Sequence, residues 1–275
     1  MKLAFAASAV AALMACGIAG AATTKHVVET AAGGSVEADF SYDYDAKNYR
    51  FANPHVTIKR GGAVLVDGSV QPFASYAEVD PARYFEHQKS VAVVDLDGDV
   101  EPEIVLDLFW GGAHCCWYSQ VYRYIAGANT YLLATHVWGN VAYRSADLDH
   151  DGLREFVSAD DRFSYEFTSF AASSWPVQIW TYRAGRFLDV TRKFPALARR
   201  DARRQWALAR KYRQDNTGFL SAWAADECLV GHCASAFKQL DVLRREGRVG
   251  PGWDKTARRY LVHLRKFLRR LGYLR

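Results

Sequence analysis

The amino-acid sequence predicts a mainly β region at about residues 36–195, followed by an α-helical region at 196–275. Two blocks, each an acidic stretch followed by apolar segments, repeat 52 residues apart. After Pro195, apolar residues recur every three or four positions instead, which is the spacing of a helix. The charge changes at the same point: residues 23–195 carry eight more acidic than basic side chains, and residues 196–275 carry twelve more basic than acidic ones. We therefore place a domain boundary near Pro195.

Residues 1–22 have the composition of an export signal. One lysine precedes an apolar run that ends in small residues, and the run is too short to span a membrane, so we expect no transmembrane helix in the mature chain. Two outcomes are open. The segment Leu13-Met14-Ala15-Cys16 resembles a bacterial lipobox, in which Cys16 would carry a lipid, whereas cleavage after Ala21 or Ala22 would release the chain. Both outcomes predict an exported protein that is secreted, periplasmic or lipid-anchored at the cell surface.

Strands follow in order along the β region. The composition, 50% hydrophobic and 14% aromatic, is that of a folded chain. Segments 56–60 and 63–68 flank Gly61-Gly62, which predicts a hairpin with a two-glycine turn. The two repeated blocks then align segment by segment. The first predicts strands at 104–109, 119–124 and 131–135, and the second predicts strands at 156–158, 177–182 and 186–190.

Each block opens with acidic residues at relative positions 1, 3, 5 and 9. Calcium takes six to eight oxygen ligands, and the odd-numbered positions of a tightly turning loop can all direct oxygens inward. We therefore predict two calcium sites, although acidic clusters between strands are also common in ordinary turns. The first site would use Asp95, Asp97, Asp99 and Glu103 with the carbonyl of Glu101, and the second would use Asp147, Asp149, Asp151 and Glu155 with the carbonyl of Leu153.

An Asp-x-Asp-x-Asp-x-x-x-Glu loop before an apolar strand resembles the loop of FG-GAP repeats (integrin-alpha-like, VCBS-type). In that family such units are β-propeller blades that bind calcium at their edge. The second loop is the better match, because Gly152 stands at position six, whereas the first has Val100 there and Gly98 at position four. The resemblance covers less than half the chain.

The number of units argues against a closed propeller. Two full units and a partial one fall short of the roughly four to eight blades that closure requires. The expected fold is an incomplete or open propeller of two or three twisted antiparallel sheets. We expect the helical region to cover an otherwise exposed sheet edge.

The helical region has four segments with helical periodicity: 201–213, 219–227, 234–246 and 254–271. In the last segment most basic side chains lie off the apolar stripe. An exported chain with this charge would meet an anionic component of the cell envelope before any nucleic acid. The competing interpretation is a solvated basic face on helices that pack against the acidic β region.

Four cysteines remain beyond Cys16: Cys115, Cys116, Cys228 and Cys233. An even number in an exported protein suggests disulfides. We favour a Cys228–Cys233 bond at the turn between two helices, with Cys115 and Cys116 either bonded to each other or reduced and buried. The rival arrangement links Cys115 and Cys116 to Cys228 and Cys233.

The chain contains no Gly-x-Ser-x-Gly, His-Glu-x-x-His or phosphate-loop motif. The sequence therefore predicts a non-enzymatic, calcium-binding exported or cell-surface protein, of a binding or adhesion type, with calcium in a structural role. The alternative is an exported hydrolase acting on anionic envelope polymers or polysaccharide.

Overall fold

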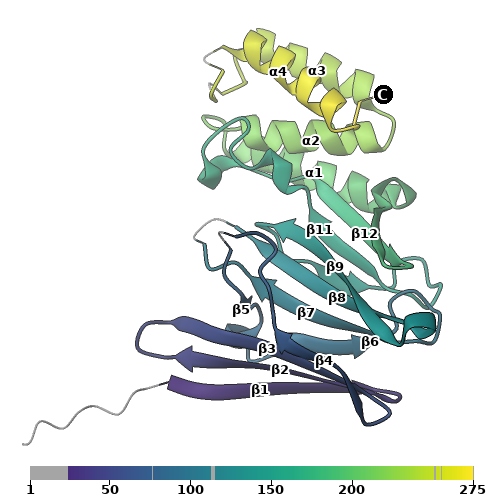
Figure 1. The fold of residues 1–275 in the computed structure, drawn as a ribbon. Coiled ribbons are helices and arrows are strands. Elements are labelled where there is room, and N and C mark those ends of the chain that lie inside the picture. The colour runs from purple at the N-terminus through teal and green to yellow at the C-terminus, as the bar shows by residue number, and fades with distance from the viewer. Residues whose placement is uncertain (1–23, 76, 113–114, 251, 255, 275) are drawn as a thin grey trace, which may run out of the picture.

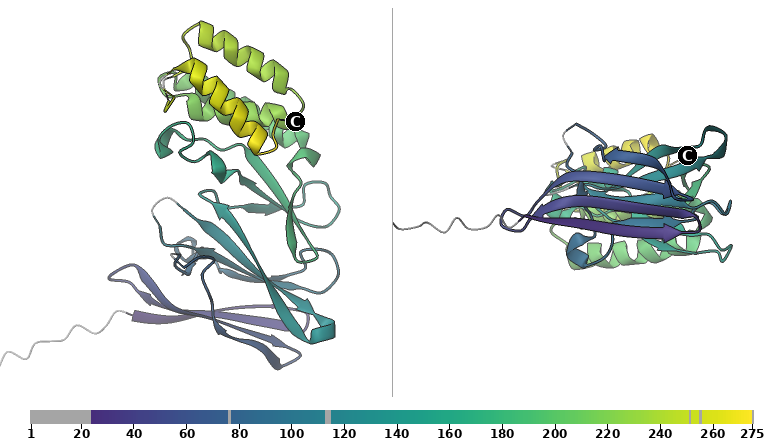
Figure 2. Two further views of the ribbon diagram at one scale, coloured as in Figure 1. Left: turned by 45° about the horizontal axis from the view of Figure 1, so that its top comes forward. Right: turned by 60° about the horizontal axis from the view of Figure 1, so that its bottom comes forward.

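The computed structural model describes residues 24–75, 77–112, 115–250, 252–254 and 256–274. The expected export signal and Cys16 lie outside these residues. Within the described part, the chain forms three antiparallel sheets, none of which closes on itself. Figures 1 and 2 show the sheets stacked in chain order, with the helices at the end of the stack farthest from the first sheet.

The first sheet is a four-stranded meander. Its strands are β1 (Thr24–Gly33), β2 (Val36–Asp45), β3 (Arg50–Arg60) and β4 (Ala63–Ser69). The predicted hairpin is confirmed, since Arg60 pairs with Ala63. β1 lies ahead of the expected start at residue 36. It escaped prediction because it is a mostly exposed edge strand, without the alternation of buried residues that marks β2.

The second and third sheets confirm the two repeated blocks, because both place a short strand, the acidic stretch and a longer strand in the same sequence. In the second sheet two short strands share one edge of β7. Its strands are β5 (Asp80–Pro81), β6 (Val91–Val94), β7 (Glu103–Phe109), β8 (Trp117–Ile125) and β9 (Thr130–Gly139). The third sheet consists of β10 (Arg144–Ala146), β11 (Glu155–Ala159), β12 (Val177–Arg183) and β13 (Arg186–Asp189).

Alternation along β7 supplies two separate cores. Ile104 and Leu106 are fully buried in the core between the first and second sheets. Val105, which points to the other face, is buried with Phe156 and Tyr182 in the core between the second and third sheets. The second sheet is therefore buried on both faces.

The four predicted helices are confirmed. They are α1 (Pro195–Lys211), α2 (Thr217–Leu229), α3 (Cys233–Arg245) and α4 (Ala257–Arg270). α1 packs against β12, an inner strand, so the helices meet the third sheet away from the edge that we expected them to cover. Among the described residues, no helix combines the length and apolar character needed to cross a membrane.

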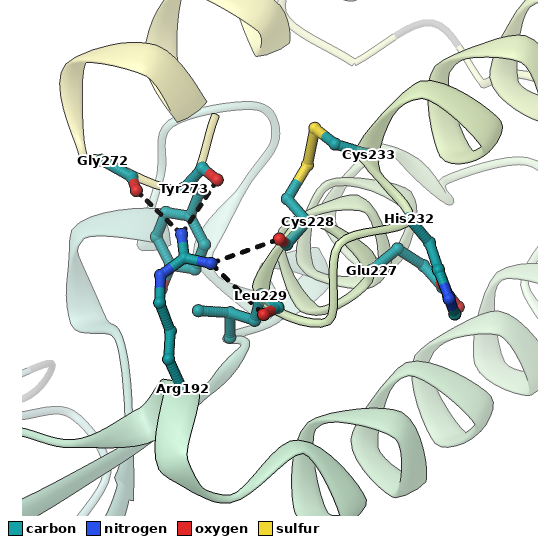
Figure 3. Close-up of a disulfide and its surroundings, with 8 residues drawn as sticks. All are labelled: Arg192, Glu227, Cys228, Leu229, His232, Cys233, Gly272 and Tyr273. Carbon is teal, nitrogen blue, oxygen red and sulfur yellow. Dashed lines mark hydrogen bonds and ion pairs between the residues drawn. A yellow bond between two sulfur atoms is a disulfide. The ribbon is translucent and has the colours of Figure 1, made fainter. Parts of the chain in front are cut away.

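Arg192, just after the third sheet, connects the sheets to two helix ends (Figure 3). Its guanidinium donates hydrogen bonds to the carbonyl oxygens of Cys228 and Leu229, at 3.4 and 3.2 Å, and of Gly272 and Tyr273, at 3.0 and 3.1 Å. Carbonyl groups at helix C-termini lack partners within the helix and carry partial negative charge. Arg192 therefore satisfies the ends of α2 and α4 together.

The cysteines are paired locally. Cys228 is bonded to Cys233, which joins the end of α2 to the start of α3 as favoured from the sequence. Cys115 is bonded to Cys116. The rival arrangement, with bonds between the sheet and the helices, is not the one that the structure contains.

Candidate metal centre

The two acidic loops occupy the same place in their sheets. The first loop, residues 95–103, joins β6 to β7, and the second loop, residues 147–155, joins β10 to β11. Three hydrogen bonds recur at equivalent positions. In the first loop, backbone N–H groups donate from Val100 to Asp95, from Glu101 to Asp99 and from Leu96 to Glu103. In the second loop, the equivalent groups donate from Gly152 to Asp147, from Leu153 to Asp151 and from Leu148 to Glu155.

Both loops adopt left-handed backbone conformations at positions four and six. In the first loop φ is 80° at Gly98 and 72° at Val100, and in the second it is 61° at His150 and 90° at Gly152. From the sequence, the two loops were ranked only by the residue at position six, where a left-handed conformation is expected. The structure shows two such positions, and each loop has glycine at one of them. The backbone path gives no reason to rank the second loop above the first.

In the first loop, oxygens of Asp95, Asp97 and Asp99 lie within 4.8 Å of one another. Glu103 lies beneath them with a side chain only 1% exposed. Burial, with added repulsion from the neighbouring aspartates, raises the pKa of Glu103 to about 7. Asp97 Oδ1 and Glu103 Oε1 are buried and accept no hydrogen bond from the described residues. This group of carboxylates requires a positive charge.

Arg123 of β8 reaches into the first loop. Its Nη2 lies 3.0 Å from Asp99 Oδ2, and its Nε lies 3.7 Å from Asp97 Oδ2 and 3.8 Å from Glu103 Oε1. Spacing along the chain did not point to this residue. Only the pairing of β8 with β7 brings it opposite the loop.

Residues from the neighbouring sheets also contact the first loop. Arg60 of β3 binds the carboxylate of Glu101 with both terminal nitrogens, one of them at 2.5 Å. The prediction assigned only the main-chain carbonyl of Glu101 to an ion, so it did not foresee this side-chain contact. From the third sheet, the backbone N–H of Ala184 donates to Asp97 at 2.8 Å. The first loop therefore contacts all three sheets.

The second loop brings together oxygens of Asp147, Asp149 and Glu155, which lie within 4.8 Å of one another. Asp151 stands outside this group, with Arg183 Nη2 3.6 Å from its Oδ2. Burial, with repulsion from Asp149 and Asp151, raises the pKa of Glu155. Asp147 Oδ1 is buried, and no described residue donates a hydrogen bond to it. Carboxylate oxygens with unused acceptor capacity fit a hard cation.

A basic groove lies between α3 and α4. Figure 1 shows these two helices at the end of the molecule away from the sheets that carry the acidic loops. It has a volume of about 640 Å³, and Arg265 stacks 4.4 Å above the ring of Phe237 in its wall. Its lining is Phe237, Asp241, Arg244, Arg258, Leu261, Val262, Arg265, Lys266 and Arg269. Within the described residues, four of these cations, Arg258, Arg265, Lys266 and Arg269, have no carboxylate oxygen within 4.0 Å.

Carboxylates also line cavities elsewhere in the described part of the chain. A cleft of about 480 Å³ between the third sheet and α1 is lined by one carboxylate, Asp201, which already binds Arg204 at 2.7 Å. A cavity of about 390 Å³ is lined by Asp160, Asp161 and Asp189. All three accept hydrogen bonds from neighbouring protein groups, as in the pairing of Asp160 with Arg162. Neither cavity presents a free carboxylate pair for acid–base chemistry.

No family model matches the chain. It is 29% identical over 191 residues to an uncharacterized protein of Sinorhizobium fredii, an alignment that covers 67% of this chain and 29% of that protein. It is 29% identical over 217 residues to a probable thylakoid lumen protein of Synechocystis, covering 75% of this chain and 60% of that protein. The chain thus spans less than two thirds of either relative's length.

Proposed function

We propose that this chain is a non-enzymatic, exported calcium-binding protein, built on FG-GAP-like units, in which one calcium ion has a structural role at the second loop. One observation carries the proposal: Asp147, Asp149 and Glu155 converge within 4.8 Å, and Asp147 contributes a buried oxygen with no donor among the described residues. Carboxylates that converge in this way repel one another unless a cation neutralises them.

The role of the ion follows from the position of the second loop. Asp147, Asp149 and Glu155 would hold it, with the carbonyl of Leu153, whereas Asp151 lies beside Arg183 outside this group. By neutralising these groups, calcium would stabilise the connection between β10 and β11 and therefore the third sheet, against which the helices pack. Export is supported by the pattern of residues 1–22 and by the similarity to the Synechocystis protein, a probable thylakoid lumen protein.

Thermal unfolding with and without a chelator tests the structural role. We expect the chelator to lower the melting temperature, and Asp149→Ala to abolish most of that difference. Asp67→Ala serves as the control, because Asp67 is an exposed carboxylate on β4, outside both loops, and its removal should leave the calcium effect unchanged. An identical melting temperature for the unaltered protein in calcium and in chelator would contradict the proposal.

The basic groove supports a second part of the proposal, binding to an anionic lipid headgroup of the cell envelope. Cations without an acidic partner, next to the apolar Leu261 and Val262, suit a negatively charged headgroup attached to an apolar chain. The competing interpretation is a solvated basic face without a ligand, on helices that pack against the acidic sheets. α3 and α4 lie on the far side of the helical region from the sheets, so both interpretations leave this face open to solvent (Figure 1). The alternative function, an exported hydrolase, lacks a free carboxylate pair in the two cavities described above.

Vesicle co-sedimentation tests the groove. The protein should sediment with vesicles of anionic phospholipid, less so at high salt, and not with zwitterionic vesicles. Replacing both Arg265 and Lys266 with Glu should abolish binding. The matched control replaces Arg199 and Arg203, exposed on α1, with Glu and should bind as the unaltered protein does. Equal loss in both variants would show a general charge effect instead of a groove.

A further inference from the structure

We propose that Arg123 is the built-in cation of the first loop, so that the chain binds one calcium ion and not the two that its paired acidic motifs suggest. This inference rests on the proposed function for the second loop, where the ion would bind. It assigns to a side chain of β8 the role that calcium has in the second loop.

The contacts of Arg123 support this role. Its guanidinium lies within 4 Å of Asp97, Asp99 and Glu103, three of the four carboxylates expected to bind the first ion. Asp97 and Glu103 are 6% and 1% exposed, so water can do little to stabilise their charges. Buried carboxylates need a compensating positive charge close by. Arg123 supplies one in the space between these side chains.

The strand register identifies the counterpart of Arg123 in the third sheet. Ile104 pairs with Tyr122 in the second sheet, and Phe156 pairs with Trp180 in the third. One step further along each pair of strands, Glu103 stands opposite Arg123, and Glu155 stands opposite Thr181. The two glutamates hold position nine of their loops. Threonine therefore occupies in the third sheet the place that arginine occupies in the second.

Thr181 cannot neutralise the second loop. Its hydroxyl is buried, 6% exposed as a residue, and it has no hydrogen-bond partner in the described part of the chain. Among the described residues near this loop, Arg183 lies 3.6 Å from Asp151 only and is 33% exposed, and the exposed Arg154 donates to the carbonyl oxygen of Ser145 instead of to a carboxylate. The second loop is thus left with a charge deficit that an ion would fill.

The two loops also differ in how far neighbouring residues cover them. The third sheet covers the first loop, where Ala184 donates to Asp97 and where the Tyr182 hydroxyl is buried without a partner among the described residues. In the second loop, Asp149 holds the same position as Asp97 but is exposed. Folding places an arginine of the chain in the covered site, so that site needs no ion from solvent. The exposed site can exchange an ion with solvent.

Exchanging the two register residues tests the inference. Calcium binding is counted by titration calorimetry on the purified protein, with thermal melts in calcium and in chelator. The unaltered protein should bind one ion, Arg123→Thr should bind two, and Thr181→Arg should bind none. Arg186→Thr, which removes an exposed arginine of β13 outside both loops, is the control and should bind one ion.

The outcomes separate this inference from the proposed function. If the unaltered protein binds no calcium but Arg123→Thr binds one ion, the second-loop proposal fails while the role of Arg123 stands. Two ions on the unaltered protein, no gain in Arg123→Thr, or an equal gain in Arg186→Thr would each overturn the inference. An Arg123→Thr variant that folds only when calcium is added supports it. If that variant does not fold at all, Thr181→Arg decides, and unchanged calcium binding by Thr181→Arg would overturn the inference.

Discussion

The first loop and the second loop follow the same backbone path, with left-handed residues at the same two positions and the same three hydrogen bonds, yet different residues surround their carboxylates. The first loop is covered by the third sheet and contacted by Arg123, whereas the second has Thr181 in that register position. The acidic motif therefore predicts the shape of the loop. By our proposal, the residue on the facing strand determines whether an arginine or a calcium ion neutralises the loop.

Removing the arginine near each loop should give the largest difference in stability between a first-loop variant and a second-loop variant. In chelator, Arg123→Met should lower the free energy of unfolding by about 3–5 kcal/mol, because Asp97 and Glu103 would be left buried without a counter-charge. Arg183→Met should cost less than about 1 kcal/mol, since both members of that ion pair are partly exposed to solvent. Urea unfolding of both variants measures the difference, and losses of similar size would remove the distinction between the loops.

The interface between the second and third sheets also contains an aromatic cluster around His136, separate from the charged contacts of Arg123. Its ring lies 4.1 Å from that of Trp138 and 4.5 Å from those of Trp180 and Phe187, and burial lowers the pKa of His136 to about 4. An unfolded histidine has a pKa of about 6.5, so protons bind the unfolded chain more readily. Stability from this residue should be complete above about pH 6.5 and fall by up to about 3 kcal/mol as the pH drops toward 4.

Comparing urea unfolding of His136→Phe with the unaltered protein at several pH values isolates this contribution. The difference between the two proteins should depend on pH between about 6.5 and 4. Adding His136→Phe to the Arg123→Met variant should produce the same pH-dependent difference, because Arg123→Met alters the charged part of the interface only. A His136→Phe protein with the pH profile of the unaltered protein would contradict the assignment.

Each loop has one residue other than glycine in a left-handed conformation, Val100 or His150, and replacing it with glycine should have the smallest effect on stability. A branched residue is poorly suited to positive φ, so Val100→Gly should stabilise the protein by up to about 1 kcal/mol. Histidine tolerates this conformation better, so His150→Gly should gain only a few tenths of a kcal/mol. Thermal melts in chelator measure both, and a larger gain at His150 than at Val100 would contradict this ranking of backbone strain in the two loops.

The parts of the fold that follow local patterns were predictable from sequence. Alternating and helical periodicity located all four helices and six of the nine described strands of the second and third sheets, whereas the short strands β5, β6 and β10 were not predicted. β1 was missed because its exposed polar residues carry no such pattern. In the first sheet a turn at Gly34-Ser35, and not an acidic loop, joins the first two strands. The repeated acidic motif therefore did not identify it as a full sheet.

The candidate site was predictable only in part. Spacing identified the acidic positions of both loops, because loop ligands are close in sequence. The roles of Arg123 and Arg60 depend on which residues face each other across strands and between sheets. These contacts link residues 24 and 41 positions apart, and no local pattern encodes them.

Arg192 has a consequence for local unfolding. Its guanidinium binds the carbonyl oxygens of the last two residues of α2 and those of Gly272 and Tyr273 just beyond α4, so neither helix end can open without breaking hydrogen bonds to the same side chain. Amide hydrogen exchange at the C-terminal turns of these two helices should therefore proceed at linked rates, and it should accelerate at both when Arg192 is replaced.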